Sequence, residues 1–254
     1  MSRLLAALLL VSAAGAAQAQ FRLPNIDVNR MVDSVKNVGK ATKEINQEEE
    51  IAIGRDLAAT LLGAAPLVND AKLQTYVNNV GRWIAAQSER PDLPWQFGVL
   101  DAPQLNAFAV PGGTIFITRG LLERMRSEAE LAGVLGHEIV HVVKKHHLKA
   151  IQKGAMTALA GDALALATQN RGSAATNEKL VSFGKEMYSR GLDKGDEFEA
   201  DRLGVVLAAR AGYESYGLPS VLQTLQSMNA EDSGVALMFK THPAPGERLE
   251  QLGD

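Results

Sequence analysis

The chain has 254 residues, of which 46% are hydrophobic and 22% charged, and its formal net charge is −3. This length and composition allow one sizeable hydrophobic core. The net negative charge argues against a nucleic-acid-binding protein, since that function needs a basic face that neutralises phosphates. The absence of cysteine excludes disulfides, thiolate metal ligands and a thiol nucleophile.

The first 19 residues have the pattern of a secretory signal peptide. One early cation, Arg3, precedes an apolar run that ends in the small residues Ala17 and Ala19. The run is shorter than the roughly twenty apolar residues that span a bilayer, so we expect cleavage after Ala19 and export. An exported chain without cysteine is compatible with a bacterial periplasm. Residues 20–46 then form a lead-in, and residues 47–254 a single domain.

The sequence of the first half of the domain predicts two helices followed by strands. Apolar residues recur at helical spacing over residues 47–87, where Gly63 and Pro66 divide the run in two. Residues 95–103 and 112–120 predict strands, because they are short, β-branched and bounded by proline or glycine.

The best-defined helix is predicted over residues 127–147. It opens with a capping box, Ser127 to Glu130, and ends in the cations Lys144 and Lys145. Further helices are expected over residues 155–169, 195–210 and 218–228, a loop over 168–177, and a loop and short helix at the C-terminus. Several helices around a small sheet predict an α+β fold.

Two histidines and a glutamate stand in the middle of this helix, in the segment HEIVH. At about 100° per residue, His137 and His141 lie about 40° apart on one face, so both imidazoles can bind one ion. Glu138 flanks that face and can reach a metal-bound water without ligating the metal. Ordinary core histidines are the alternative. They are disfavoured because the helix is apolar around much of its circumference, where unpartnered polar groups are costly.

Catalytic zinc usually has three protein ligands and a water, so a third ligand is needed from elsewhere. The acidic segment DEFEAD offers it: Glu197 and Asp201 are four residues apart and share a helix face. We expect Glu197 to be the third ligand and Asp201 to accept the free ring N–H of a ligating histidine. Asp196 and Glu199 point elsewhere and are expected to be solvated, or ion-paired with Arg202.

His146 and His147 lie at the C-terminal end of the same predicted helix. His146 is about 140° from His141 around the helix, on the opposite face. We therefore expect both residues to form a solvated helix end.

Four segments carry a resemblance to a known family: NAFAVPGGTIFITRGLL at 106–122, HEIVH, EFEAD followed by RLG, and THP at 241–243. The chain resembles the gluzincin metallopeptidases of the HtpX and CAAX prenyl protease family, and within it the soluble periplasmic branch of BepA-like and LoiP-like proteins. The resemblance implies a mainly helical, zincin-like domain with a small sheet whose edge strand lines the cleft. It also implies one Zn²⁺ per chain, with Glu138 as general base and three ligands: His137, His141 and Glu197.

The resemblance implies a substrate-binding strand as well. Asn106, Ala107 and the strand through Thr114, Ile115 and Phe116 would form the upper edge of the cleft. An exposed strand edge can hold an extended peptide by main-chain hydrogen bonds. Spacing alone fits an ordinary hairpin with a Pro-Gly-Gly turn equally well.

His242 precedes a proline and therefore lies in a non-helical loop. The resemblance implies that this histidine approaches the zinc. There it would either occupy the water position in a resting state or stabilise the oxyanion of the tetrahedral intermediate.

The expected function is zinc-dependent endopeptidase activity on protein or peptide substrates. The resemblance implies that these are extended segments of misfolded or damaged envelope proteins, with possible peripheral association with the membrane or with envelope proteins. The alternative is a zinc-containing chaperone-like or binding module whose metal site is blocked by His242. Glu138 argues against it, since a structural metal site needs no general base. A serine hydrolase is disfavoured because the G-x-S-x-G segment is absent.

Overall fold

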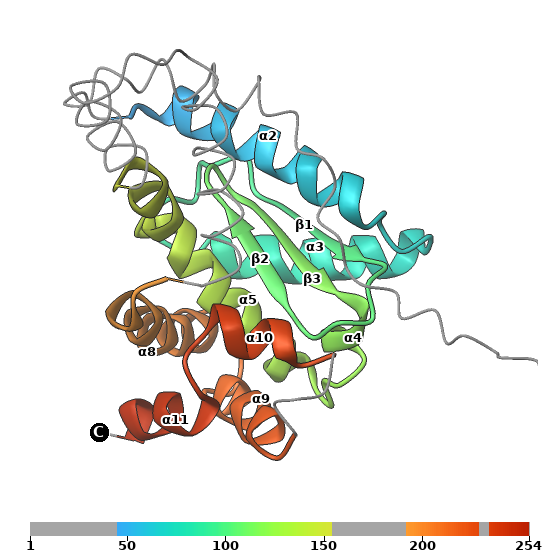
Figure 1. Cartoon of the computed structure of the whole chain (residues 1–254), viewed down its shortest axis with the longest axis vertical. Helices are drawn as coiled ribbons and strands as arrows, with labels where there is room; N and C mark the ends of the chain where they lie inside the picture. The colour runs from blue at the N-terminus through green and yellow to red at the C-terminus, as the bar shows by residue number, and fades with distance from the viewer. Residues whose placement is uncertain (1–44, 154–191, 229–233, 254) are drawn as a thin grey trace, which may run out of the picture.

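The computed structural model of the chain describes residues 45–153, 192–228 and 234–253 (Figure 1). The predicted signal peptide with its cleavage site after Ala19 lies outside the described residues, as do nearly all of the lead-in, the expected 155–169 helix and the expected 168–177 loop.

The sheet has three strands: β1 (Gln96–Leu100), β2 (Ala107–Val110) and β3 (Thr114–Thr118). Their order is β1-β3-β2, with β1 parallel and β2 antiparallel to β3. A tight turn joins β2 to β3, and Gly112 and Gly113 take φ values of 82° and 104° there, which favour glycine. The strand expected at the cleft edge, β3, is therefore the central strand. Its backbone is hydrogen-bonded on both sides, and the edge strands of the described sheet are β1 and β2.

The helices enclose this sheet. They include α2 (Gln47–Ala64), α3 (Ala71–Ala85), α4 (Arg119–Leu122), α5 (Glu128–Val143), α8 (Lys194–Arg210), α9 (Gly217–Gln226), α10 (Ala236–Thr241) and α11 (Pro245–Gly253). The α+β expectation is confirmed, although α10 was not predicted as a helix. Among these described helices, none combines the length and apolar character that crossing a bilayer requires.

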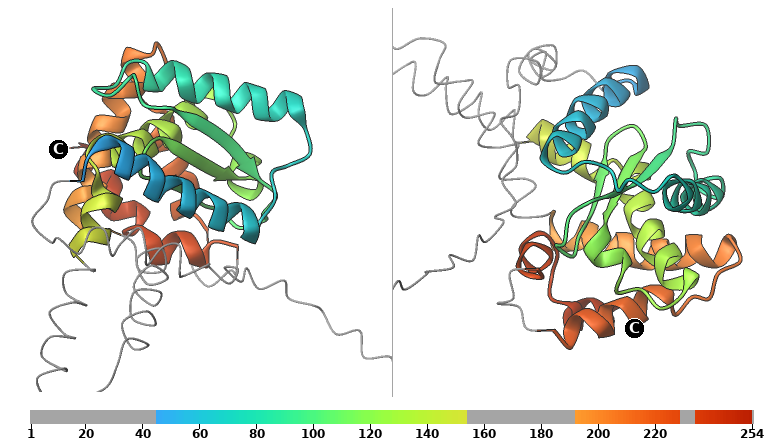
Figure 2. Two further views of the ribbon diagram at one scale, coloured as in Figure 1. Left: turned by 90° about the horizontal axis from the view of Figure 1, so that it is seen from above. Right: turned by 90° about the vertical axis from the view of Figure 1, so that its right-hand side faces the viewer.

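The two faces of the sheet pack on different helices, because successive side chains of a strand alternate between faces. Phe108 and Phe116 pack with Leu57 and Leu61 of α2. Ala107, Ala109, Ile115 and Ile117 face the opposite way, into the larger core built on α3 and α5. Figure 2 shows α2 on one side of the sheet and the C-terminal helices beyond α5 on the other. This arrangement places α5 in the middle of the molecule.

Helix α5 is buried on nearly all sides. Its positions from Glu130 to Val142 are all buried, which explains the apolar residues around its circumference. Ser127 caps its N-terminus by accepting a hydrogen bond from the Glu130 backbone. In the expected capping box the Glu130 carboxylate would accept a hydrogen bond from the backbone N–H of Ser127. It accepts instead from the backbone N–H of Arg126, at 2.7 Å.

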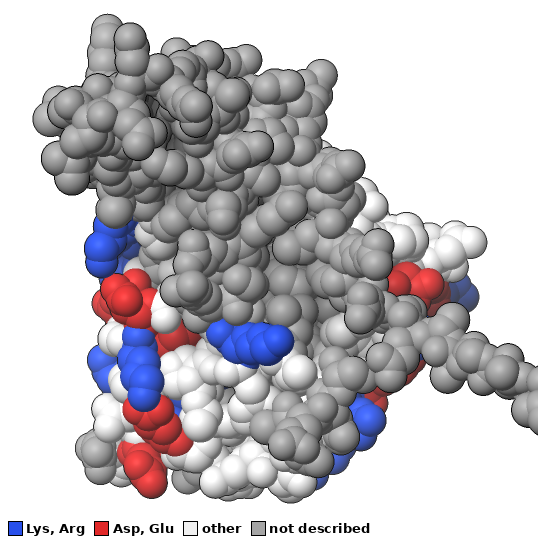
Figure 3. All heavy atoms as spheres, in the orientation of Figure 1, with Lys and Arg blue, Asp and Glu red and all other residues white. Residues whose placement is uncertain are grey.

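Charged side chains of both signs are interspersed over the described part of the face shown in Figure 3. An ion pair links two of the helices, since Nζ of Lys194 in α8 lies 2.7 Å from Oε1 of Glu247 in α11.

Helices α5 and α8 approach closely at two glycines. A Cβ atom on Gly204 would lie 2.7 Å from the backbone nitrogen of His137, and one on Gly136 would lie 2.7 Å from the carbonyl oxygen of Gly204. Each contact is shorter than a Cβ atom can tolerate without backbone movement. The two glycines thus set the distance between HEIVH and DEFEAD.

Gly204→Ala should therefore lower the free energy of unfolding by about 1–3 kcal/mol, the usual cost of overpacking a core. Gly195→Ala is the matched control on the same helix, since a Cβ there meets no atom within 4 Å. It should leave stability unchanged or raise it by about 0.5–1 kcal/mol, because alanine favours helix. Urea unfolding of both variants in the presence of a chelator measures the difference. Equal stability of the two would contradict the close-contact explanation.

Candidate metal centre and cleft

Three side chains from two helices meet at one point inside the molecule. Nε2 of His137 lies 3.0 Å from Nε2 of His141 and 3.7 Å from Oε2 of Glu197, and Nε2 of His141 lies 3.5 Å from Oε1 of Glu197. All three side chains are at most 3% exposed. The structure thus brings together the three residues predicted as ligands.

These residues fit a metal ion. Bonds of about 2.0–2.2 Å in a tetrahedral zinc site place ligand atoms about 3.3–3.6 Å apart, close to the distances found here. Nδ1 of His137 lies 2.9 Å from Oδ1 of Asp201, so its proton is on Nδ1 and Nε2 carries a lone pair. Burial and the neighbouring histidines hold the pKa of His141 well below its usual value, which keeps that ring neutral. Lone pairs and a carboxylate converging in this way repel one another unless a cation lies between them.

Asp201 occupies the predicted position beside His137, and it has a second partner that the sequence did not indicate. Arg248 of α11 donates from Nε to Oδ2 at 2.9 Å and from Nη2 to Oδ1 at 2.5 Å. Burial would raise the pKa of Asp201, but the Arg248 hydrogen bonds and charge hold it well below the usual range. Nη2 also lies 3.3 Å from Nδ1 of His137, a contact between two donors rather than a hydrogen bond.

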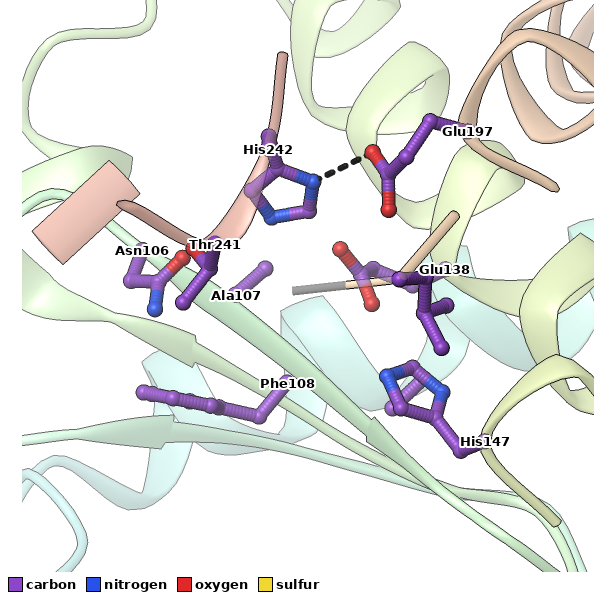
Figure 4. A pocket seen from close by; sticks show the side chains of 10 residues that line it. Asn106, Ala107, Phe108, Glu138, His147, Glu197, Thr241 and His242 are labelled. Atoms are coloured by element: carbon purple, nitrogen blue, oxygen red, sulfur yellow. Dashed lines mark hydrogen bonds and ion pairs between the residues drawn. The ribbon is translucent and has the colours of Figure 1, made fainter. Parts of the chain in front are cut away.

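Glu138 lies at a cavity beside the three donors. Burial raises the pKa of its carboxyl group, although the nearby His137 and His242 oppose the rise. Figure 4 shows Glu138 and Glu197 on one side of this cavity and, on the other, Asn106 with the β2 residues Ala107 and Phe108. A second cavity shares Ala107, Glu138 and His242, and its remaining wall is mostly apolar: Leu121, Val134, Leu218, Val221, Leu222, Leu225 and Met238.

The predicted substrate residues separate into two groups. Asn106 and Ala107 line the cavity beside Glu138, and the Asn106 amide is buried with neither polar atom hydrogen-bonded. Thr114, Ile115 and Phe116 are not among the lining residues of either cavity. The expectation for these three is wrong, because β3 is central and its Ile115 and Phe116 side chains are buried in the two cores.

His242 reaches the site from the turn after α10. Its Nδ1 lies 2.6 Å from Oε2 of Glu197, and its ring centre is 5.6 Å from that of His137. Burial lowers the pKa of His242, but the Glu197 carboxylate outweighs burial and the pKa lies above its usual value. Conversely, burial would raise the pKa of Glu197, but His242 and His137 lower it to about 2. The structure thus places His242 beside one donor.

The expected solvated end of the helix is wrong. Helix α5 ends at Val143, Lys145 takes a φ of 58°, and a new helix covers residues 146–153. The 100° rotation per residue therefore no longer applies after Val143. His146 is 1% exposed, with Nδ1 at 2.9 Å from Nδ1 of His141, and His147 lines the cavity beside Glu138.

Glu199 and Asp196 are half exposed, as a solvated pair would be, but they face a different partner from the expected Arg202. Oε2 of Glu199 lies 3.2 Å and Oδ1 of Asp196 3.6 Å from Nε2 of His146.

A helical domain with a small mixed sheet, in which HEIVH on one helix meets a glutamate from another, is the arrangement of a metallopeptidase. The chain belongs to peptidase family M48, whose model matches residues 71–254. It is 31% identical to the beta-barrel assembly-enhancing protease of Yersinia pestis over 97% of this chain and 51% of that protein. It is 33% identical to the mitochondrial metalloendopeptidase OMA1 of Schizosaccharomyces pombe over 70% of this chain and 51% of that protein.

Metalloprotease LoiP of Escherichia coli is a further relative, 28% identical over 72% of this chain and 69% of that protein. The chain spans about half the length of the beta-barrel assembly-enhancing proteases that it matches.

Proposed function

We propose that this chain is a zinc-dependent endopeptidase. The observation that carries the proposal is the position of Glu138, a buried carboxyl group beside three converging metal donors, in a cavity whose opposite wall is a strand edge. His137, His141 and Glu197 would hold the ion, with Asp201 fixing the ring of His137. Zinc in such a site makes a bound water more acidic and polarises a carbonyl group.

Glu138 would act as the general base. It takes a proton from the attacking water and transfers it to the leaving amine. A base is most effective when its pKa lies near the working pH, and burial moves the pKa of Glu138 in that direction. Because Glu138 follows His137 directly on α5, the base and one ligand are positioned by the same turn of helix.

The substrate would bind as an extended segment along β2. This strand is an edge strand of the described sheet, and an edge strand can bind an extended peptide by main-chain hydrogen bonds. The unpaired amide of Asn106 can both donate to and accept from such a peptide. The apolar cavity beside Glu138 and His242 suits an apolar side chain next to the scissile bond.

The cellular role we infer is quality control of cell-envelope proteins in a bacterial periplasm. The support is the signal-peptide pattern that ends at Ala19, together with the names of two relatives, beta-barrel assembly-enhancing protease and metalloprotease LoiP. The partners would be protein or peptide substrates, with peripheral association with the membrane or with envelope proteins.

Removing the metal tests the proposal. Treatment with a chelator should abolish cleavage of casein, an extended protein substrate, and one equivalent of Zn²⁺ per chain should restore it, because the converging donors alone provide no Lewis acid. Metal analysis and gel-based digestion measure both effects. Cleavage by protein verified to be free of metal would contradict the proposal.

The contact between His242 and Glu197 at 2.6 Å also favours the alternative function, a zinc-containing binding module with a blocked site. His242→Ala separates the roles of this residue. Digestion should increase if His242 occupies the water position, and decrease if it stabilises the oxyanion. A folded wild type that binds zinc but cleaves nothing, and whose His242→Ala variant is equally inactive, would favour the binding module.

A further inference from the structure

Behind His141, on the side away from the three donors, lies a second polar group that the proposed mechanism does not use. It consists of His146, Glu199 and Asp196, and we name it the His146 cluster. His146 is 1% exposed, whereas the side chains of Glu199 and Asp196 are 41% and 36% exposed. The cluster therefore connects a buried imidazole to carboxylates at the surface.

The distances determine where the protons of this cluster lie. Nε2 of His146 is 3.2 Å from Oε2 of Glu199, and a carboxylate only accepts, so Nε2 carries the proton. A neutral imidazole carries one proton, so His146, which donates from Nε2 to Glu199, presents an acceptor at Nδ1. Nδ1 of His141 at 2.9 Å must then be the donor. This leaves Nε2 of His141 with a lone pair directed at Nε2 of His137 and at Glu197, which is the tautomer that a metal requires.

The turn that positions His146 is itself fixed by buried charge. Glu50 is fully buried, accepts two hydrogen bonds from Arg90 at 2.8 and 2.9 Å, and lies 3.6 Å from Nζ of Lys145. Lys145 is the residue with a φ of 58°, a conformation that is unfavourable for a non-glycine residue. Arg90 also donates to the Val142 carbonyl at 3.3 Å. These contacts hold the chain reversal that turns His146 back toward His141.

We propose that His146 and Glu199 are positioning residues for the metal centre: Glu199 fixes the tautomer of His146, and His146 fixes the tautomer and ring orientation of His141. The His146 cluster plays for His141 the part that Asp201 plays for His137. Each of the two histidines predicted to bind the metal thus has its own hydrogen-bond acceptor. Such partners of metal-bound histidines contribute about 10- to 100-fold in metal affinity. This inference rests on the proposed zinc site.

A second cation bound by His146, Asp196 and Glu199 is the competing explanation, because their ligand atoms lie within 4.8 Å of one another. The hydrogen bond from Nε2 of His146 to Glu199 already satisfies both groups. The two carboxylates are also partly exposed to solvent, so they need no cation to compensate for burial. We therefore favour the hydrogen-bonded arrangement and treat a second cation as an outcome of the test.

The test is zinc affinity, measured on the full chain by competition with a chromophoric chelator. His146→Phe, which keeps a planar aromatic ring but offers no acceptor, should weaken zinc binding about 10- to 100-fold. Glu199→Gln should weaken it less, and it keeps the measurement possible if His146→Phe does not fold. Because Glu199 acts only through His146, adding Glu199→Gln to His146→Phe should have no further effect. Asp193→Asn, an exposed N-cap of the same helix without a side-chain capping bond, is the charge-matched control and should bind zinc as tightly as wild type.

A readout other than activity separates positioning from a purely structural role. The rise in Tm on adding zinc should shrink in the folded variants, while the Tm of the metal-free protein changes less, because zinc stabilises in proportion to its affinity. The visible spectrum of Co²⁺-substituted protein should also change. Unaltered zinc affinity in Glu199→Gln and His146→Phe would overturn the inference, as would two zinc ions per wild-type chain with one lost in Glu199→Gln. A wild type that binds no zinc would overturn the proposed function first.

Discussion

Replacing Glu138 by glutamine is expected to abolish cleavage of an unfolded protein substrate while the fold and the zinc content persist. Glutamine has nearly the same shape, but its amide cannot take a proton from water. General-base catalysis contributes about 10²- to 10⁴-fold, so the remaining rate should be at most about one hundredth of the wild-type rate. Glu138 is absent from the three-donor set, and so the metal should stay bound.

Digestion kinetics, metal analysis and circular dichroism on the same preparations check this result. Glu128→Gln is the matched control, because Glu128 lies on the same helix but its carboxylate accepts hydrogen bonds from Tyr76 and Tyr213, away from the cleft. It should retain activity within about twofold, since surface changes have small effects. Undiminished cleavage by Glu138→Gln would refute the peptidase assignment, whereas loss of zinc in this variant would assign Glu138 to the metal instead.

The convergence of the three candidate metal donors could be predicted from the sequence, because each prediction rests on spacing within one helix. His137 and His141 are one turn apart on α5, and Glu197 and Asp201 are one turn apart on α8. Two histidines buried on an apolar helix need a shared partner such as a metal ion, and the metal then needs a third ligand. The acidic helix that contains Glu197 was the natural source of that ligand. The packing of α5 on α8 through Gly136 and Gly204 is what joins the two pairs.

Other features of the site depend on backbone events and long-range pairing that no local pattern encodes. His146 was misplaced because a helix was extended through Lys145, whose positive φ reverses the chain. The edge strand was misassigned because strand order within a sheet is set by packing, and β1 happens to pair with β3. Arg248 was missed since no spacing rule connects it to Asp201, 47 residues earlier.

Arg248→Met should be the most destabilising of the substitutions considered. Arg248 is 4% exposed and its guanidinium makes two hydrogen bonds to Asp201, which is fully buried. Removing one member of a buried pair leaves an uncompensated charge and typically costs about 3–5 kcal/mol, largely because the other charge stays buried. We therefore expect the free energy of unfolding of the metal-free protein to fall by about that amount at neutral pH, as measured in urea.

The double variant Arg248→Met/Asp201→Asn shows whether the unpaired charge is the cause. It removes that charge and keeps an amide oxygen able to accept from Nδ1 of His137, so it should recover most of the lost stability. Arg202→Met, one residue beyond Asp201 and exposed, is the control and should change the free energy of unfolding by less than about 0.5 kcal/mol. If the double variant were as unstable as Arg248→Met alone, lost packing of the arginine side chain would be the cause. The attachment of α11 to the candidate metal centre would then depend on the packing of the Arg248 side chain rather than on its charge.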